Sequence, residues 1–187
     1  MTSLGRGSGT IRTRRLHDGR IIRVDEDTVR FPDGSSGTLD VVRHPGASAV
    51  LPFLGDPAGP DPELLLLRQY RHAAGAWLTE IPAGRLEPNE PPAECARREL
   101  LEETGCTAAN VTHLTTIFTT PGFSDERIHL FMATGLTMGE SRRERDEFIE
   151  ITRTPMSAAL RQIGNGEITD AKSIIAILFA AGFRCSQ

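Results

Sequence analysis

The chain has 187 residues, of which 25% are charged and 39% hydrophobic, enough for one domain with a sizeable core and a small appendage. Its net charge of −4 at pH 7 argues against a nucleic-acid-binding surface. No apolar run reaches the length that crosses a bilayer, and the N-terminal sequence MTSLGRGSGTIRTRR lacks the apolar segment of a signal peptide, so we expect no membrane partner.

Three cysteines, Cys95, Cys106 and Cys185, are scattered without a paired spacing. Reduced thiols in a cytoplasmic protein are the simplest interpretation of this pattern.

The first part of the chain is predicted to be separate from the rest. Residues 1–10 are rich in glycine and serine, which predicts disorder. Residues 11–42 consist of short β-like runs broken by turn signals, which predicts a small antiparallel β appendage. The sequence His44-Pro45-Gly46 marks the junction, and we assign residues 43–187 to the main domain.

The main domain contains apolar runs with the length of strands, separated by turn residues. We predict strands at residues 47–54, 63–70, 77–81, 111–120, 128–134 and 148–151, and two closing helices near residues 157–164 and 170–182. Strands on both sides of a central helix, with helices at the end, predict an α/β layered domain.

The central helix lies within GRLEPNEPPAECARRELLEETGC, residues 84–106. Pro91 and Pro92 suit the first helical turn, with Asn89 or Glu90 as the cap. Gly105 is placed to end the helix, and alanines and leucines recur at the spacing of one buried stripe.

Three carboxylates crowd one sector of this helix. The side chains of Glu99 and Glu103 lie about 40° apart around the axis, with Glu102 between them in sequence and Arg98 beside them. One interpretation is a solvated acidic face. The alternative is a metal site, favoured by the tight Gly/Pro loop that precedes the helix, because converging hard oxygen ligands suit Mg²⁺ or Mn²⁺.

This segment is similar to the Nudix box, Gly-x5-Glu-x7-Arg-Glu-apolar-x-Glu-Glu-x-Gly-apolar. The matching residues are Gly84, Glu90, Arg98, Glu99, Leu100, Glu102, Glu103, Gly105 and Cys106. Only Cys106 departs from the pattern, since a larger aliphatic residue is more usual there. The resemblance implies a Nudix-type α/β/α sandwich with a mixed sheet and hydrolysis of a diphosphate linked to a nucleoside.

The resemblance also implies residue roles. Glu99, Glu103 and the Ala83 carbonyl would bind the metal ion, with Glu102 a third carboxylate acting directly or through water. Bound Mg²⁺, or Mn²⁺ in its place, would orient the diphosphate and activate the attacking water. Glu103 is therefore also counted among the catalytic residues.

The other fixed positions are interpreted as structural. Arg98 is expected to form an ion pair that holds a glutamate of the loop. Gly84 is interpreted as a turn residue, and Glu90 as a helix cap or an ion-pair partner.

The flanking segments resemble ADP-ribose pyrophosphatases. Pro121, sixteen residues after Gly105, lies in TPGFSDER, which is similar to a loop of that subfamily. The segments Arg68-Gln69-Tyr70-Arg71, His44-Pro45-Gly46 and GEITDA at residues 166–171 are similar as well. The resemblance implies cleavage of ADP-ribose to AMP and ribose 5-phosphate.

Three residues are predicted to contact the substrate. The guanidinium of Arg71 matches phosphate oxygens, and Arg85 makes the edge of the pocket more cationic. Glu126 would bind ribose or a metal-bound water, or else form only a salt bridge to Arg127.

The resemblance places the general base in the acidic segment 139–147, where Glu140, Glu144, Asp146 and Glu147 are all eligible. We choose Glu147 first and Glu144 second, because Glu147 directly precedes a predicted strand. The alternative is that the whole segment is a solvated charged loop.

Partners and competing functions follow from the same resemblance. In related enzymes the N-terminal appendage packs across a two-fold partner and helps to bind adenine, which implies a homodimer. Another nucleoside diphosphate sugar, such as GDP-mannose, is an alternative substrate. A non-catalytic Nudix sensor that binds nucleotide is a further alternative, which the complete set of box glutamates disfavours.

Overall fold

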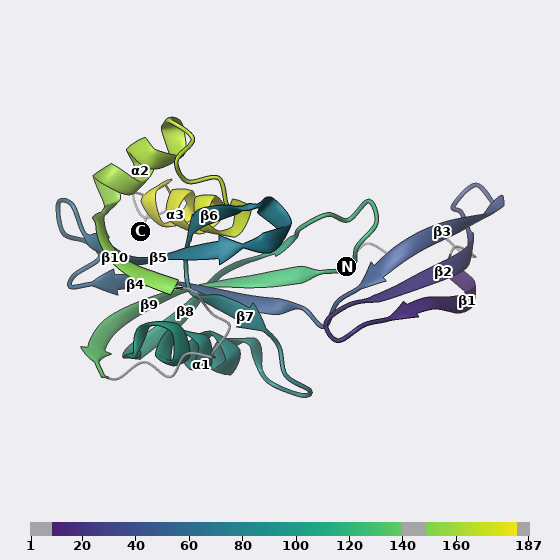
Figure 1. Ribbon diagram of the computed structural model, residues 1–187, viewed down its shortest axis with the longest axis horizontal. Helices are drawn as coiled ribbons and strands as arrows, with labels where there is room; N and C mark the ends of the chain where they lie inside the picture. Colours follow the sequence, from purple (N-terminus) through teal and green to yellow (C-terminus); the bar gives the residue numbers. More distant parts are fainter. Residues whose placement is uncertain (1–8, 140–148, 183–187) are drawn as a thin grey trace. The chain divides into compact units, whose positions relative to one another are not determined.

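The computed structural model describes residues 9–139 and 149–182 (Figure 1). The chain divides into two compact units. The smaller unit comprises Met1–Gly46 with Phe118–Arg127, and the larger comprises Ala47–Ile117 with Ile128–Gln187.

The smaller unit contains a three-stranded antiparallel sheet, in the order β1 (Gly9–Asp18), β2 (Arg23–Arg30) and β3 (Ser36–Arg43). The predicted small N-terminal antiparallel sheet is therefore confirmed. Strand β1 already includes Gly9 and Thr10, which were expected to be disordered, because both pair with the end of β2. The rest of that segment, residues 1–8, lies outside the described residues.

The Phe118–Arg127 loop belongs to the smaller unit because it is hydrogen-bonded to the end of β3. The Val42 N–H donates to the Phe123 carbonyl at 2.7 Å, and the Asp125 N–H donates to the Val42 carbonyl at 3.2 Å. The Asp125 carboxylate in turn accepts the His44 N–H at 2.9 Å. These residues are about 80 positions apart in sequence, so no local pattern indicated the association.

The larger unit is built on a seven-stranded mixed sheet with the path β10-β5-β4-β9-β8. Its strands are β4 (Ala47–Leu54), β5 (Glu63–Arg71), β6 (Ala76–Glu80), β7 (Ala83–Arg85), β8 (Cys106–Phe118), β9 (Arg127–Met138) and β10 (Ile149–Pro155). Strands β4 and β9 run parallel, whereas β5 is antiparallel to β4, β6 and β10. The short strand β7 pairs antiparallel with β4.

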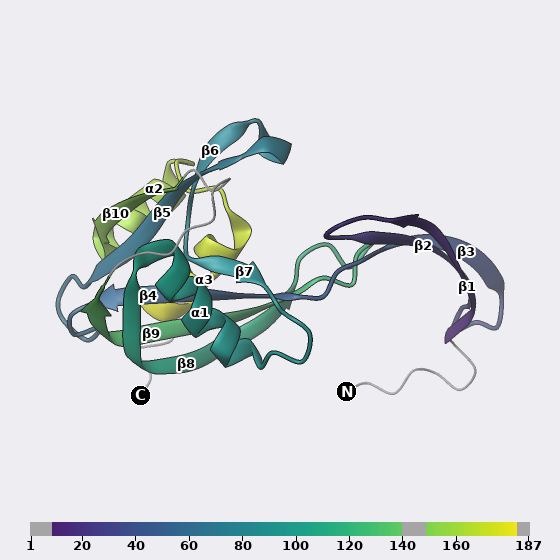
Figure 2. The same ribbon diagram turned by 60° about the horizontal axis from the view of Figure 1, so that its bottom comes forward.

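Helices cover both faces of this sheet. Helix α1 (Pro92–Thr104) lies on one face, while α2 (Met156–Gly164) and α3 (Ala171–Gly182) lie on the other, as two views show (Figures 1 and 2). The predicted α/β/α sandwich with a mixed sheet is confirmed. Across residues 9–139 and 149–182, every helix is too short or too polar to cross a membrane.

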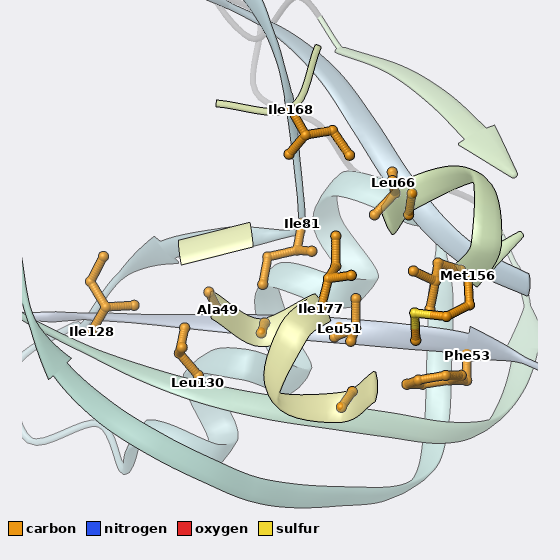
Figure 3. Close-up of a cluster of buried hydrophobic side chains, with 14 of the residues drawn as sticks. Ala49, Leu51, Phe53, Leu66, Ile81, Ile128, Leu130, Met156, Ile168 and Ile177 are labelled. Atoms are coloured by element: carbon orange, nitrogen blue, oxygen red, sulfur yellow. The ribbon is translucent and has the colours of Figure 1, made fainter. Parts of the chain in front are cut away.

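Strand β4 is nearly all apolar because both of its faces are buried. Ala49, Leu51 and Phe53 pack into the core beneath α2 and α3 (Figure 3). Val50 points to the opposite side and belongs to the cluster that includes Leu100 of α1. The two cores hold β4, and with it the paired strand β7, in a rigid position.

The start of α1 differs from the prediction, whereas its end agrees with it. The N-cap position is Pro91 and makes no side-chain cap hydrogen bond, so the expected cap at Asn89 or Glu90 is wrong. Pro92, the first helical residue, has no N–H to satisfy, which reduces the need for a cap. At the other end Gly105 has the left-handed φ of 73° and its N–H donates to the Leu101 carbonyl.

Candidate active site

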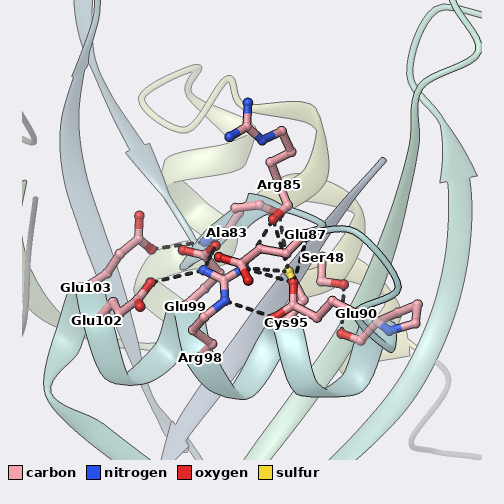
Figure 4. A network of polar contacts seen from close by, with 12 residues as sticks. Ser48, Ala83, Arg85, Glu87, Glu90, Cys95, Arg98, Glu99, Glu102 and Glu103 are labelled. Carbon is pink, nitrogen blue, oxygen red and sulfur yellow. Dashed lines mark hydrogen bonds and ion pairs between the residues drawn. The ribbon is translucent and has the colours of Figure 1, made fainter. Parts of the chain in front are cut away.

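The three predicted carboxylates and Ala83 are brought together where α1 packs beside β7 (Figure 4). Glu103 is 2% exposed and accepts the Ala83 N–H at 3.0 Å. Glu99, one helical turn earlier, is 8% exposed. Two buried carboxylates from one helix therefore lie beside the end of a strand that is held by the core.

Gly84 makes room for one of these carboxylates. A Cβ atom at this position would overlap the carboxylate group of Glu99. Gly84 lies within strand β7, so its interpretation as a turn residue is wrong. The absence of a side chain at Gly84 instead allows Glu99 to approach the backbone next to Ala83.

Arg98 connects the preceding loop to the helix. Its Nε and Nη2 donate to the Glu90 carboxylate at 2.8 and 3.0 Å, while Nη1 donates to Glu99 at 2.6 Å and to Glu102 at 3.0 Å. The hydrogen bonds from Arg98 are the main reason that the pKa of Glu90 falls to about 2. They also raise the pKa of Arg98. Glu90 is thus an ion-pair partner and not a helix cap.

Backbone carbonyls of the loop are enclosed by the same residues. Arg98 Nη2 donates to the Arg85 carbonyl at 3.1 Å, and the Cys95 thiol lies 3.6 Å from the carbonyls of Gly84 and Arg85. The side chain of Arg85 points away from this network (Figure 4). Burial raises the pKa of the Cys95 thiol to about 12, so the thiol is protonated near neutral pH.

The donor set fits a hard divalent cation. In the described parts of the chain, no three His, Cys, Asp or Glu side chains form a ready-made metal cage. Mg²⁺ does not require one, because it is usually held by one or two carboxylates, with waters and substrate phosphates completing its shell. Glu99 and Glu103 supply such carboxylate oxygens beside the Ala83 backbone, and Gly84 leaves the space that the Glu99 carboxylate occupies.

Arg71, predicted to contact phosphate, is paired with Glu80, for which the sequence predicts no role. Its Nε and Nη2 donate to the Glu80 carboxylate at 2.8 and 2.7 Å. The hydrogen bond to Glu80 raises the pKa of Arg71, and the nearby negative charge of Glu103 adds to the effect. The Arg71 guanidinium is therefore within electrostatic reach of Glu103. A signal for Glu80 was present in the sequence, since it is an acidic residue at the end of an apolar strand.

Glu126 belongs to the smaller unit, where its partners are Thr119 at 2.8 Å and His44 at 3.3 Å. Arg127 instead lies over the ring of Phe118, 4.7 Å from its centroid. Glu126 therefore pairs with Thr119 and His44, and the alternative prediction of a salt bridge to Arg127 is not what the structure shows. The eligible bases Glu140, Glu144, Asp146 and Glu147 lie outside the described residues.

The chain is similar to known proteins along most of its length. Residues 43–175 match the model of the NUDIX domain family. The chain is 37% identical over 172 residues to the ADP-ribose pyrophosphatase of Bacillus subtilis (strain 168), covering 91% of this chain and 90% of the relative. It is 36% identical over 172 residues to the methanol dehydrogenase activator of Bacillus methanolicus, with the same coverage of 91% and 90%.

A solved structure described as an ADP compounds hydrolase has the same fold. Its TM-score is 0.81 at 20% sequence identity, covering 100% of this chain and 98% of that one. The chain therefore belongs to the Nudix family. It is a Nudix hydrolase of the ADP-ribose pyrophosphatase-like kind, and enzymes of this family generally need a divalent metal ion.

Proposed function

We propose that this protein hydrolyses the diphosphate bond of ADP-ribose, with Mg²⁺, to give AMP and ribose 5-phosphate. The observation that carries the proposal is the placement of Glu99 and Glu103 beside the Ala83 backbone, with Gly84 leaving room for a carboxylate. The similarity to a B. subtilis ADP-ribose pyrophosphatase over most of both chains supports the choice of substrate.

The metal ion would be held by Glu99, Glu103 and the Ala83 carbonyl, with Glu102 contributing directly or through water. Bound Mg²⁺, or Mn²⁺ in its place, would lower the pKa of the attacking water and neutralise charge on the diphosphate. Arg98 holds Glu99 and Glu102 on one side of the helix, so these carboxylates need little rearrangement to bind a cation.

The substrate contacts are assigned to Arg71, Arg85 and Glu126. The bidentate pair with Glu80 occupies one edge of the Arg71 guanidinium, and the remaining N–H groups can donate to phosphate oxygens. Arg85 extends its side chain away from the carboxylates, as a residue at the edge of the pocket would (Figure 4). Glu126 is assigned to ribose on the family resemblance alone.

Glu147 is proposed as the general base, with Glu144 as the second choice. The assignment rests on the position of the acidic segment before β10 in sequence. The base would accept a proton from the attacking water, which requires it to be ionised at the working pH.

The domain division, the homodimer and the cellular location are proposed as well. Residues 11–42 would form an appendage that packs on a second copy of the chain, and residues 43–187 the hydrolase domain. Ile11, Leu16 and Leu39 of the N-terminal sheet are each 46% exposed or more, which agrees with a surface that a partner covers. A cytoplasmic location is proposed from the free thiols of Cys95 and Cys106.

Two other functions are distinguished by one assay. GDP-mannose or another nucleoside diphosphate sugar would use the same metal site. A regulatory role without turnover is the other possibility, since a relative bears the name methanol dehydrogenase activator. We would measure products from ADP-ribose, GDP-mannose and related compounds with Mg²⁺, with Mn²⁺ and with EDTA. Turnover of ADP-ribose that EDTA abolishes supports the proposal, whereas nucleotide binding without turnover of any compound contradicts it.

A further inference from the structure

A buried carboxylate in the larger unit is shared between two cations from different parts of the chain. Glu80, at the end of β6, is 2% exposed and binds both Arg71 and Lys172. Lys172 is itself only 8% exposed. It is the only lysine in the sequence, where the other 20 of the 21 basic residues counted as Lys or Arg are arginines.

The first turn of α3 also forms a hydrogen bond with Ile81, the residue that follows Glu80. Lys172 is paired with Asp170 at 3.0 Å, and Asp170 accepts hydrogen bonds from the N–H and hydroxyl of Ser173 at 3.0 and 2.5 Å. The Ser173 Oγ accepts the N–H of Ile81 at 2.8 Å. Side chains from one helical turn therefore bind two consecutive residues, Glu80 and Ile81, from 92 positions away.

The same stretch of backbone continues into the metal site. The Pro82 carbonyl accepts the N–H of Val50 at 2.9 Å, and the Ala83 N–H donates to Glu103 at 3.0 Å. Each residue from Glu80 to Ala83 thus has a polar partner in another element, which is α3 for Glu80 and Ile81, β4 for Pro82 and α1 for Ala83. These contacts, together with the pairing of Ala83 with Ala49 of β4, hold the backbone of this segment beside Glu103.

The charges of both cations favour the ionised form of Glu80. Burial by itself raises the pKa of Glu80, but the hydrogen bonds from Arg71 and the charge of Lys172 outweigh it, and the pKa is lowered overall. An ionised Glu80 can then hold the Arg71 fork through two hydrogen bonds. The guanidinium has five N–H groups, so those that Glu80 does not engage keep a set direction.

We propose that Lys172 is a positioning residue for the substrate: through the buried carboxylate of Glu80 it orients the Arg71 guanidinium toward the diphosphate beside Glu103. The inference rests on the proposed function, because it takes Arg71 as a phosphate contact. It goes further by assigning the orientation of Arg71 to a side chain on α3, a helix on the opposite face of the sheet from the box helix (Figure 1).

The test compares wild type with Lys172→Met, Lys172→Arg, Arg71→Gln and the Lys172→Met/Arg71→Gln double variant. The affinity for ADP-ribose is measured in EDTA by calorimetry, and kcat and KM are measured with Mg²⁺. Arg161→Met is the matched control, because it also removes one positive charge, from the exposed side of α2. Melting temperatures are recorded for every variant, so that loss of stability is separated from loss of function.

We expect Lys172→Met to weaken ADP-ribose binding about tenfold and Lys172→Arg to restore most of the loss, with Arg161→Met unchanged. In a protein that already carries Arg71→Gln, Lys172→Met should not weaken ADP-ribose binding further, because Lys172 acts on the substrate through Arg71. A lowered melting temperature with unchanged affinity and KM would show a merely structural role and overturn the proposal. So would an equal effect of Lys172→Met in both backgrounds.

A second measurement needs no variant. Because Lys172 is the only lysine, ¹⁵N labelling of lysine side chains gives a single ammonium signal. This signal should shift when ADP-ribose is added in EDTA, and an unchanged signal at saturating ADP-ribose would overturn the proposal. A wild type that cleaves ADP-ribose while Lys172→Met behaves like wild type refutes the positioning role alone. A wild type that neither binds nor cleaves ADP-ribose refutes the proposed function and the positioning role together.

Discussion

Arg98 and Glu90 form a two-point ion pair, with Nε and Nη2 of the arginine 2.8 and 3.0 Å from the two carboxylate oxygens. Glu90 also accepts the N–H of Glu87 at 2.9 Å, and the third nitrogen of Arg98 donates to Glu99 at 2.6 Å. One guanidinium therefore connects the loop before α1 to a proposed metal ligand on the helix. The stability of this loop and the orientation of the ligand should depend on the same pair.

Replacement of Glu90 by Gln should destabilise the protein in a pH-dependent way. We expect a loss of about 1–3 kcal/mol in the free energy of unfolding at pH 7, since charged hydrogen bonds to Arg98 are removed. The pKa of Glu90 is lowered from 4.5 to about 2, so the pair contributes fully above pH 4.5 and is lost as the pH falls toward 2. Denaturant unfolding at several pH values checks this. If the difference in the free energy of unfolding between wild type and Glu90→Gln does not become smaller below pH 4.5, the Glu90–Arg98 ion pair is not its source.

Gly84→Ala should impair the metal site more than the fold. The added Cβ would overlap the Glu99 carboxylate, which must move away from Ala83. We expect metal affinity and turnover to fall by about 10- to 100-fold, the range seen when groups that orient metal ligands are disturbed. Gly164→Ala, at the end of α2 where a Cβ meets open space, is the control. Equal activity of the two variants would show that Glu99 need not occupy its present position.

Glu103→Gln should abolish most metal-dependent turnover without unfolding the protein. Glutamine keeps an oxygen that can accept the Ala83 N–H, but it lacks the charge that a divalent cation requires. We expect turnover to fall by at least about 100-fold, which is more than the loss expected when a residue that only orients a metal ligand is replaced. Calorimetric titration with Mg²⁺ and Mn²⁺ and steady-state assays check this. Glu94→Gln, exposed in the first turn of α1, should retain activity, and an active Glu103→Gln would remove Glu103 from the metal site.

Glu147→Gln should remove the general base, whereas Glu144→Gln should not. A positioned base contributes about 10²- to 10⁴-fold, so kcat for Glu147→Gln should fall within that range while KM changes little. The profile of kcat against pH should lose its acidic limb in the same variant. If Glu144→Gln shows these effects instead, the order of the two assignments is reversed. If neither variant does, the base lies outside this pair.

Cys95 should resist thiol reagents in the folded protein. Its pKa of about 12, raised by burial, leaves very little thiolate near neutral pH. Alkylation followed by peptide mass mapping should show Cys95 unmodified in native protein and fully modified after unfolding in guanidinium chloride. Rapid native labelling would mean that the loop carrying Gly84 and Arg85 opens readily, since the thiol lies against their carbonyls.

The parts of the fold that could be predicted are those that are specified by residues close together in the sequence. The strand at residues 47–54 agrees with β4 because a run of apolar residues buried on both faces needs no distant partner to be recognised. The box helix was predicted because its carboxylates and its terminal Gly105 lie within one short segment. The cap was wrong because Glu90 is used by Arg98, a competing ion pair that spacing alone did not reveal.

The family and the mixed α/β fold could be predicted from the sequence, and so could the spacing of Glu99 and Glu103 on one side of a helix, since a helix converts spacing directly into geometry. The groups that lie around these carboxylates follow instead from tertiary packing. The close approach of the Glu99 carboxylate to Gly84, and the sharing of Glu80 by Arg71 and Lys172, arise where separate elements pack together. Contacts between residues 92 positions apart depend on how the sheet and α3 meet, which no local pattern of residues specifies.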